Sequence, residues 1–66
     1  MRLCINGHPR EAPALATLAD LADWLQLPAH GSAVELNGRV VRRADYSTTG
    51  LAEGDSLEVV RLVGGG

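Results

Sequence analysis

The chain ends in three glycines and a carboxylate, and this end carries the most distinctive chemistry in the sequence. Gly64, Gly65 and Gly66 directly follow an apolar run over residues 57–63. Ordering each backbone residue costs roughly 1–2 kcal/mol, and glycine has no side chain to offset that cost. Fully extended, residues 63–66 reach at most about 13–14 Å. The pattern indicates a carboxylate on a thin stalk that fits a slot too narrow for side chains; a frayed terminus is the alternative.

The other candidates for chemistry are one cysteine, two histidines and scattered carboxylates. Cys4 lacks a pattern of basic neighbours that would activate its thiol, so we expect a small packing residue. His8 and His30 fall in turn-like segments and have no identifiable co-ligands. The acidic residues between positions 45 and 55 do not form the spaced pair of an acid–base catalyst. The sequence therefore predicts no catalytic residue and no metal site.

Size and composition limit the classes of function. Sixty-six residues make one small domain with little room for an enclosed catalytic cavity. A hydrophobic fraction of 45% is too high for a disordered chain, and a net charge of −2 argues against nucleic acid as the main partner. All six basic residues are arginines, so no lysine can accept an isopeptide bond. Without a membrane-length apolar run or a signal-peptide pattern, we expect a cytoplasmic protein.

The first twelve residues are predicted to form a hairpin. Alternating apolar positions over residues 1–5 predict a strand, and Asn6-Gly7 predicts a two-residue type I′ turn. The returning strand covers residues 8–12. Because Pro9 cannot donate a backbone hydrogen bond, this second strand is expected at a sheet edge.

One amphipathic helix is predicted after Pro13. Thr17 is a plausible N-cap, with Asp20 three residues later as a weaker form of the capping box. Leu18, Leu21, Ala22 and Leu25 form an apolar stripe, and Pro28 with Gly31 is expected to end the helix. The remaining segments are a second hairpin over residues 33–36 and 39–41 around Asn37-Gly38, a loop over residues 42–55 anchored by Tyr46 and Leu51, a Gly54-Asp55 turn, and a last strand over residues 56–63.

These elements predict an α+β fold of the β-grasp (ubiquitin-like) type. The expected sheet is mixed, with four to five strands and one helix packed across one face. The last strand pairs with the first in the middle of the sheet. Residues 1–63 form the domain and residues 64–66 a flexible tail.

The whole chain resembles the ThiS family of thiamine-biosynthesis sulfur carriers. The resemblance rests on the ordered set Asn6-Gly7, residues 17–21, Asn37-Gly38 with Val41 and Arg43, an aromatic at Tyr46, Gly54-Asp55, and a strand that runs into Gly65-Gly66. The sequence departs from the family at Arg42, where proline is frequent, and at Tyr46, where tryptophan is frequent.

The resemblance implies a carrier rather than an enzyme, with no bound cofactor. A ThiF-type adenylyltransferase would use ATP and Mg²⁺ to convert the Gly66 carboxylate to an acyl-adenylate. Sulfur from cysteine, supplied through a desulfurase, would then give a thiocarboxylate at Gly66. A ThiG-type thiazole synthase would take that sulfur for the thiazole ring of thiamine. The free chain is expected to be a monomer.

Docking requires a surface, and the sheet face away from the helix is the candidate. Val60 and Leu62 are apolar on the face opposite Leu57, and with Val63 they form the predicted partner interface. The alternative is that they only cover the rim of the sheet. Trp24 is expected to roof the edge of the core, with contact to a partner as the alternative. The Arg42-Arg43 pair is expected to be solvated, with steering of an acidic partner as the alternative.

Three other functions remain open at this stage. The small subunit of molybdopterin synthase is a sulfur carrier that shares the fold and the di-glycine end. A ubiquitin-like modifier would join its terminus to lysines of target proteins. A β-grasp interaction domain with an inert tail is the third.

Overall fold

The computed structural model describes residues 1–28 and 30–61. In chain order the elements are β1 (Arg2–Ile5), β2 (His8–Glu11), α1 (Leu18–Trp24), β3 (Ser32–Leu36), β4 (Arg39–Val41), the 3-10 helix η1 (Arg43–Thr48) and β5 (Ser56–Arg61).

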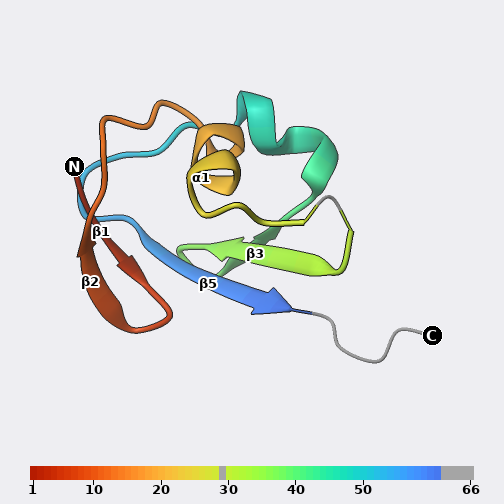
Figure 1. Cartoon of the computed structure of the whole chain (residues 1–66), viewed down its shortest axis with the longest axis horizontal. Helices are drawn as coiled ribbons and strands as arrows, with labels where there is room; N and C mark the ends of the chain where they lie inside the picture. Colours follow the sequence, from red (N-terminus) through yellow and green to blue (C-terminus); the bar gives the residue numbers. More distant parts are fainter. Residues whose placement is uncertain (29, 62–66) are drawn as a thin grey trace.

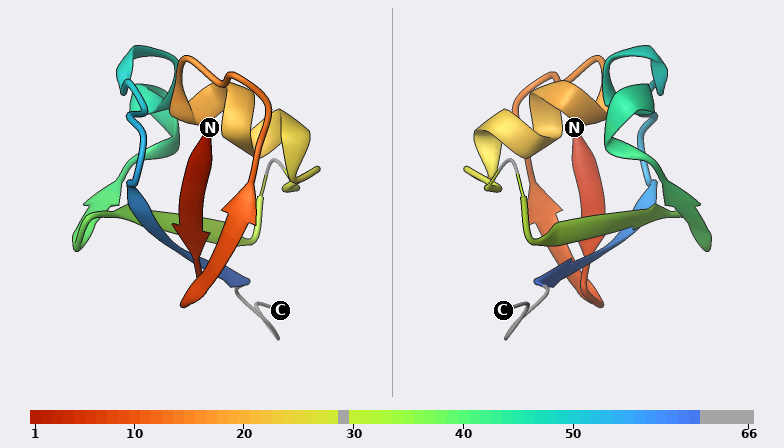
Figure 2. Two further views of the ribbon diagram at one scale, coloured as in Figure 1. Left: turned by 90° about the vertical axis from the view of Figure 1, so that its left-hand side faces the viewer. Right: turned by 90° about the vertical axis from the view of Figure 1, so that its right-hand side faces the viewer.

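The strands form one mixed sheet in the order β2-β1-β5-β3-β4. β1 and β5 are parallel, and the other neighbours are antiparallel. Figures 1 and 2 show α1 and η1 on the same side of this sheet. The predicted α+β architecture, with the last strand paired to the first in the middle of the sheet, is confirmed.

Both predicted Asn-Gly turns are present. Asn6 and Gly7 have φ angles of 52° and 81°, and Asn37 and Gly38 have 52° and 85°. A type I′ turn needs positive φ at both central residues, which asparagine and glycine tolerate better than other residues. β2 lies at the edge of the sheet, so Pro9 leaves no ladder bond unmade, as predicted.

Helix α1 begins as the sequence predicts and ends earlier. The Thr17 hydroxyl accepts from the Asp20 amide at 3.3 Å, and the Asp20 carboxylate accepts from the Thr17 amide at 3.1 Å. At the other end Gln26 takes a φ of 57°, and the Leu27 amide donates to the Ala22 carbonyl at 2.9 Å. This is a Schellman motif, which stops the helix before the expected end at Pro28.

The expected loop over residues 42–55 contains a short helix, so that prediction is wrong in part. η1 occupies Arg43–Thr48, and the Thr48 and Thr49 hydroxyls both donate to the Asp45 carbonyl, at 3.2 and 2.6 Å. The two predicted anchors hold, because Tyr46 is buried and Leu51 packs half-buried against the core.

One hydrophobic core lies between the helices and the sheet. The buried side chains come from both layers and are Leu3, Ile5, Ala12, Leu18, Leu21, Ala22, Val34, Tyr46 and Leu57. The predicted helix stripe is confirmed at Leu18, Leu21 and Ala22, whereas Leu25 is only half-buried. This core fixes the position of β5, since Leu57 is 1% exposed.

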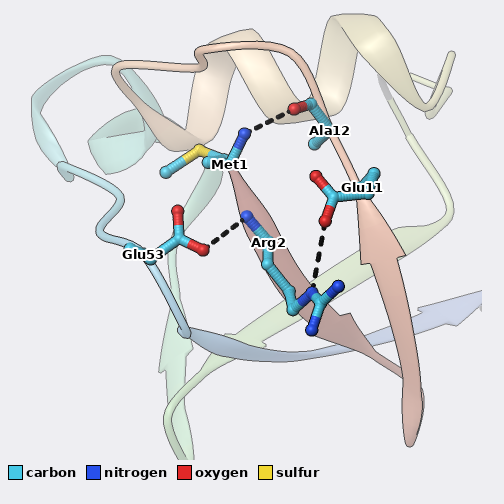
Figure 3. Close-up of polar contacts among 5 residues, drawn as sticks. All are labelled: Met1, Arg2, Glu11, Ala12 and Glu53. Atoms are coloured by element: carbon cyan, nitrogen blue, oxygen red, sulfur yellow. Dashed lines mark hydrogen bonds and ion pairs between the residues drawn. The ribbon is translucent and has the colours of Figure 1, made fainter.

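Polar contacts fasten the start of β1 to its neighbours (Figure 3). The Met1 ammonium donates to the Ala12 carbonyl at 2.7 Å, and the Arg2 amide donates to Glu53 at 2.8 Å. The Arg2 guanidinium pairs with Glu11 at 3.2 Å across the hairpin. The contact with Glu53 ties β1 to the segment that leads into β5.

Candidate functional site

β5 is the central strand and the element that precedes the glycines in the sequence. It pairs with β1 on one side and with β3 on the other. The pairing with β3 runs from Leu36↔Leu57 to Ser32↔Arg61. In Figure 1, β5 runs toward the side of the molecule away from Met1. The predicted sulfur-carrying residue Gly66, the tail residues Gly64 and Gly65, and the predicted interface residues Leu62 and Val63 lie outside the described residues.

The asparagines of the two turns bind β5 near its two ends. At its start, the Asn37 side-chain oxygen accepts from the Ser56 amide at 2.9 Å. Near its end, the Asn6 side-chain oxygen accepts from the Val59 amide at 2.7 Å, and the Asn6 side-chain nitrogen donates to the Val59 carbonyl at 3.3 Å. The turns that organise the hairpins therefore also hold the strand that leads to the tail.

The sheet face opposite the helices carries exposed apolar side chains. Val60, predicted as part of the interface, is 45% exposed. Val40 on β4 is 71% exposed, and it pairs with Glu35 on the same face of the sheet. The sequence analysis missed Val40, although alternation from the Asn37-Gly38 turn would have separated it from the inward-facing Val41.

Two carboxylates lie between these valines. Glu35 on β3 and Glu58 on β5 are direct cross-strand partners. Like charges directly opposite each other destabilise a sheet. The middle of the open face is therefore acidic, with Val60 and Val40 on the strands to either side of β3. We call these four residues the open-face patch: Glu35, Val40, Glu58 and Val60.

A shallow hollow of about 380 Å³ lies on the other side of the end of β5. Its lining is apolar apart from Asn6 and the arginines Arg10 and Arg61. The Arg10 guanidinium stacks over the Trp24 ring at 4.8 Å from its centroid. Trp24 packs half-buried against the core, which confirms that it roofs the core edge.

The structure adds a role for one arginine. Arg43 is exposed, as expected, and its guanidinium also donates to the Pro28 carbonyl at 2.6 Å and to the Ser32 hydroxyl at 3.2 Å. It also lies over the Tyr46 ring at 5.1 Å. Arg43 therefore joins three segments, whereas Arg42, which is also exposed, makes no such side-chain contact among the described residues.

The remaining candidates stay apart from one another. Cys4 is a half-buried free thiol, and His8 and His30 are exposed. Within residues 1–28 and 30–61, no three side chains of His, Cys, Asp or Glu are grouped so that they could hold a metal ion. No helix in the same described residues has the length and apolar character needed to cross a membrane.

The five-stranded mixed sheet, the helix across one face and the central last strand define a β-grasp protein. The chain belongs to the ThiS family, whose family model matches residues 3–66.

Solved structures agree with this assignment. The crystal structure of the thiamine biosynthesis protein ThiS from Geobacter metallireducens is 32% identical, with a TM-score of 0.83 over 100% of both chains. The NMR solution structure of a thiamine biosynthesis protein from the same organism is 30% identical, with a TM-score of 0.81, and covers 100% of this chain and 88% of that one.

The curated relatives are of two sizes. Thiazole synthases from Magnetococcus marinus and Paramagnetospirillum magneticum are 41% and 36% identical over 66 residues. The chain spans 20% of the length of each of these two proteins. The uncharacterized protein ycf40 of Pyropia yezoensis is 36% identical over 62 residues, which cover 94% of this chain and 87% of that protein.

Proposed function

We propose that this chain is a sulfur carrier of thiamine biosynthesis, with the sulfur carried as a thiocarboxylate on Gly66. The observation that carries the proposal is the family match over residues 3–66, which extends through the three glycines. The position of β5 supports it, because the strand that precedes the glycines is the central strand of the sheet and is paired on both sides.

The proposed chemistry begins with an unreactive group. A carboxylate is ionised at neutral pH and is a poor electrophile. A partner adenylyltransferase with ATP and Mg²⁺ would join the Gly66 carboxylate to AMP and release pyrophosphate. A persulfide derived from cysteine through a desulfurase would then attack the acyl carbon and displace AMP. Cleavage of the persulfide bond by a thiol leaves sulfur on Gly66, ready for transfer to the thiazole ring.

In this proposal the chain is a co-substrate and not the catalyst. Its contribution is to present one carboxylate within a limited distance of a docking surface, which lowers the entropic cost of reaction in the partner's active site. The partner supplies ATP and Mg²⁺, so the chain itself needs no cofactor. We expect it to act in the cytosol as a monomer between encounters.

The open-face patch is the proposed docking surface for the adenylyltransferase. Val60 and Val40 offer apolar contact, and Glu35 and Glu58 repel each other in the free chain. A partner surface with apolar side chains and one arginine or lysine would cover the valines and relieve that repulsion. Leu62 and Val63, which the sequence also predicts for the interface, lie outside the described residues.

A thiazole synthase is the proposed acceptor of the sulfur. Two thiazole synthases, each about five times as long as this chain, contain regions that are 41% and 36% identical to the whole chain, respectively. Such an arrangement places a carrier-like region and a thiazole synthase in one polypeptide. We therefore propose that this chain works with a separate or covalently linked thiazole synthase.

Intact-protein mass spectrometry tests the proposal. The chain is incubated with a ThiF-type adenylyltransferase, ATP, Mg²⁺ and a sulfide source, and the C-terminal peptide is analysed. We expect a replacement of oxygen by sulfur confined to Gly66. A Cys4→Ser variant is run alongside, because oxidation of Cys4 would produce a similar mass change. An unmodified Gly66 with an active enzyme would rule out the carrier function.

A Gly65→Ala substitution tests why the end is made of glycine. We expect adenylation to slow on the order of 10–100-fold, since a Cβ would displace the carboxylate within a narrow slot. The stability should not change. Gly50→Ala is the matched control, because a Cβ at Gly50 would meet only the Ala16 carbonyl, at an ordinary 3.8 Å. Equal adenylation rates for both variants would refute the narrow-slot explanation.

A further inference from the structure

The parallel ladder between β1 and β5 stops at Asn6. The Asn6 amide donates to the Leu57 carbonyl at 2.8 Å, which is the last backbone bond of this ladder. Asn6 then turns with a φ of 52° into the hairpin, and the chain leaves β5. Beyond this point no backbone of β1 remains beside the strand.

The Asn6 side chain takes the place of the missing backbone. Its amide group carries one donor and one acceptor in the same arrangement as a peptide group. The oxygen accepts from the Val59 amide at 2.7 Å and the nitrogen donates to the Val59 carbonyl at 3.3 Å. Both backbone groups of Val59 would otherwise lack a partner on the β1 side, whereas the β3 side stays paired through Val60 and Arg61.

We propose that Asn6 is a positioning residue that sets the direction in which β5 delivers the C-terminal carboxylate. The inference rests on the proposed carrier function. Residues 60–66 span at most about 23 Å when a partner's slot holds them extended, and a 10° change of direction at Val59 would then move the terminal carboxylate by about 4 Å. Displacements well below that size are enough to slow an enzyme that must meet a carboxylate in a fixed slot.

Asn37 provides the matched control. It has the same residue type, the same φ of 52° and the same following glycine, and its side chain also binds β5. It holds Ser56 at the start of the strand, far from the tail. Asn6→Gly and Asn37→Gly each keep a turn with positive φ and each remove one side-chain clamp. The two variants therefore differ in which end of β5 is released.

Amide hydrogen exchange in the free chain tests the clamp without any enzyme. In Asn6→Gly we expect the Val59 amide to exchange about tenfold faster relative to the buried Leu57 amide. In Asn37→Gly the Val59 amide should exchange as in the wild type. Unchanged Val59 protection in Asn6→Gly, or equal loss in both variants, would overturn the proposal.

Adenylation kinetics test the positioning role at a temperature where all variants are folded. In Asn6→Gly we expect kcat to fall about five- to tenfold with KM within about twofold, because docking is kept while the carboxylate is misaimed. Asn37→Gly should keep the wild-type kcat. Asn6→Asp retains the turn and the acceptor for the Val59 amide but loses the donor to the Val59 carbonyl. Its kcat should therefore lie between the values of Asn6→Gly and Asn37→Gly.

The outcomes separate this inference from the proposed function. A wild-type chain that the enzyme does not adenylate would refute the carrier function, while the exchange at Val59 still decides the clamp. A normal kcat in Asn6→Gly together with faster Val59 exchange would overturn the positioning role and leave the carrier function intact.

Discussion

At the scale of single residues, Arg43 shows how one side chain joins segments that are separate in sequence. Its guanidinium binds the Pro28 carbonyl and the Ser32 hydroxyl and stacks on the buried Tyr46. These contacts fix η1 against the segment between α1 and β3. The neighbouring Arg42 is exposed and has no such role among the contacts of the described residues.

An Arg43→Ala substitution should destabilise the fold by about 1–2 kcal/mol, because it removes charge-assisted hydrogen bonds and a cation–π contact. Urea unfolding followed by circular dichroism measures the loss. Arg42→Ala is the control and should stay within about 0.5 kcal/mol of the wild type. A similar loss in the two variants would show that Arg43 is as solvated as its neighbour.

Residue-level predictions succeeded where the chemistry is local. Thr17 caps its own helix end, and Asn6 takes the positive φ of its own turn, both of which the sequence displays. The contact of the Asn6 side chain with Val59 depends on the fold and was not predicted. The role of Arg43 depends on Pro28 and Ser32, which only the folded chain brings near. Gln26 was missed for another reason: left-handed backbone disfavours most residues, and here the surrounding helix end outweighs that cost.

At the scale of elements, α1 is short and depends on its two ends. Seven residues are too few for a stable isolated helix. At the first end, the Asp20 carboxylate accepts hydrogen bonds from the Ala16 and Thr17 amides, both at 3.1 Å. At the last end, in the Schellman motif, the Gln26 and Leu27 amides donate to carbonyls of the last helical turn. Hydrogen bonds at both ends thus stabilise the short helix whose apolar side chains pack into the core.

Replacing Thr17 with alanine should therefore cost about 1 kcal/mol of folding free energy through loss of the N-cap. Thr17→Ser keeps the hydroxyl and should recover most of that loss. Thermal and urea unfolding of the two variants provide the comparison. If serine proved as destabilising as alanine, the packing of the Thr17 methyl group would account for the effect instead of the cap.

The sequence was sufficient for the strands and α1 but not for η1. Strand alternation and Asn-Gly turns are short-range signals, and they located the starts of all five strands and the ends of the first four within one or two residues. The predicted end of the last strand, at residue 63, lies outside the described residues. Arg43–Thr48 has no apolar periodicity, and its helix depends on the burial of Tyr46 and on threonine hydroxyls that bind Asp45. Val40 was missed because its face depends on strand register, which the sequence analysis did not extend to β4.

At the scale of the whole molecule, the two sheet faces differ in chemistry. One face is covered by α1 and η1 and holds the core (Figure 2). The other carries the open-face patch, in which paired carboxylates lie between exposed valines. A small domain keeps such a combination only at some cost to its own stability. We interpret that cost as a consequence of recognition by a partner.

Val60→Gln tests recognition by the open-face patch. We expect the apparent KM for the chain in ATP–pyrophosphate exchange to rise about tenfold, because an apolar contact near the tail is replaced by a polar one. Ser56→Gln is the control, since Ser56 is exposed on the same face of the same strand but lies at its far end. Both variants should unfold like the wild type. A wild-type KM for Val60→Gln would exclude the patch around Val60 as the docking surface.

The central position of β5 also has a mechanical consequence. Its hydrogen bonds to β1 and β3 lie across the strand direction on both sides. In the proposed function an enzyme would draw the end of the chain into its active site, and tension along β5 would load these bonds together, in shear. A strand at the edge of the sheet would spread the same load over bonds on one side alone. The strand that would bear the tension is thus hydrogen-bonded to a neighbour on each side.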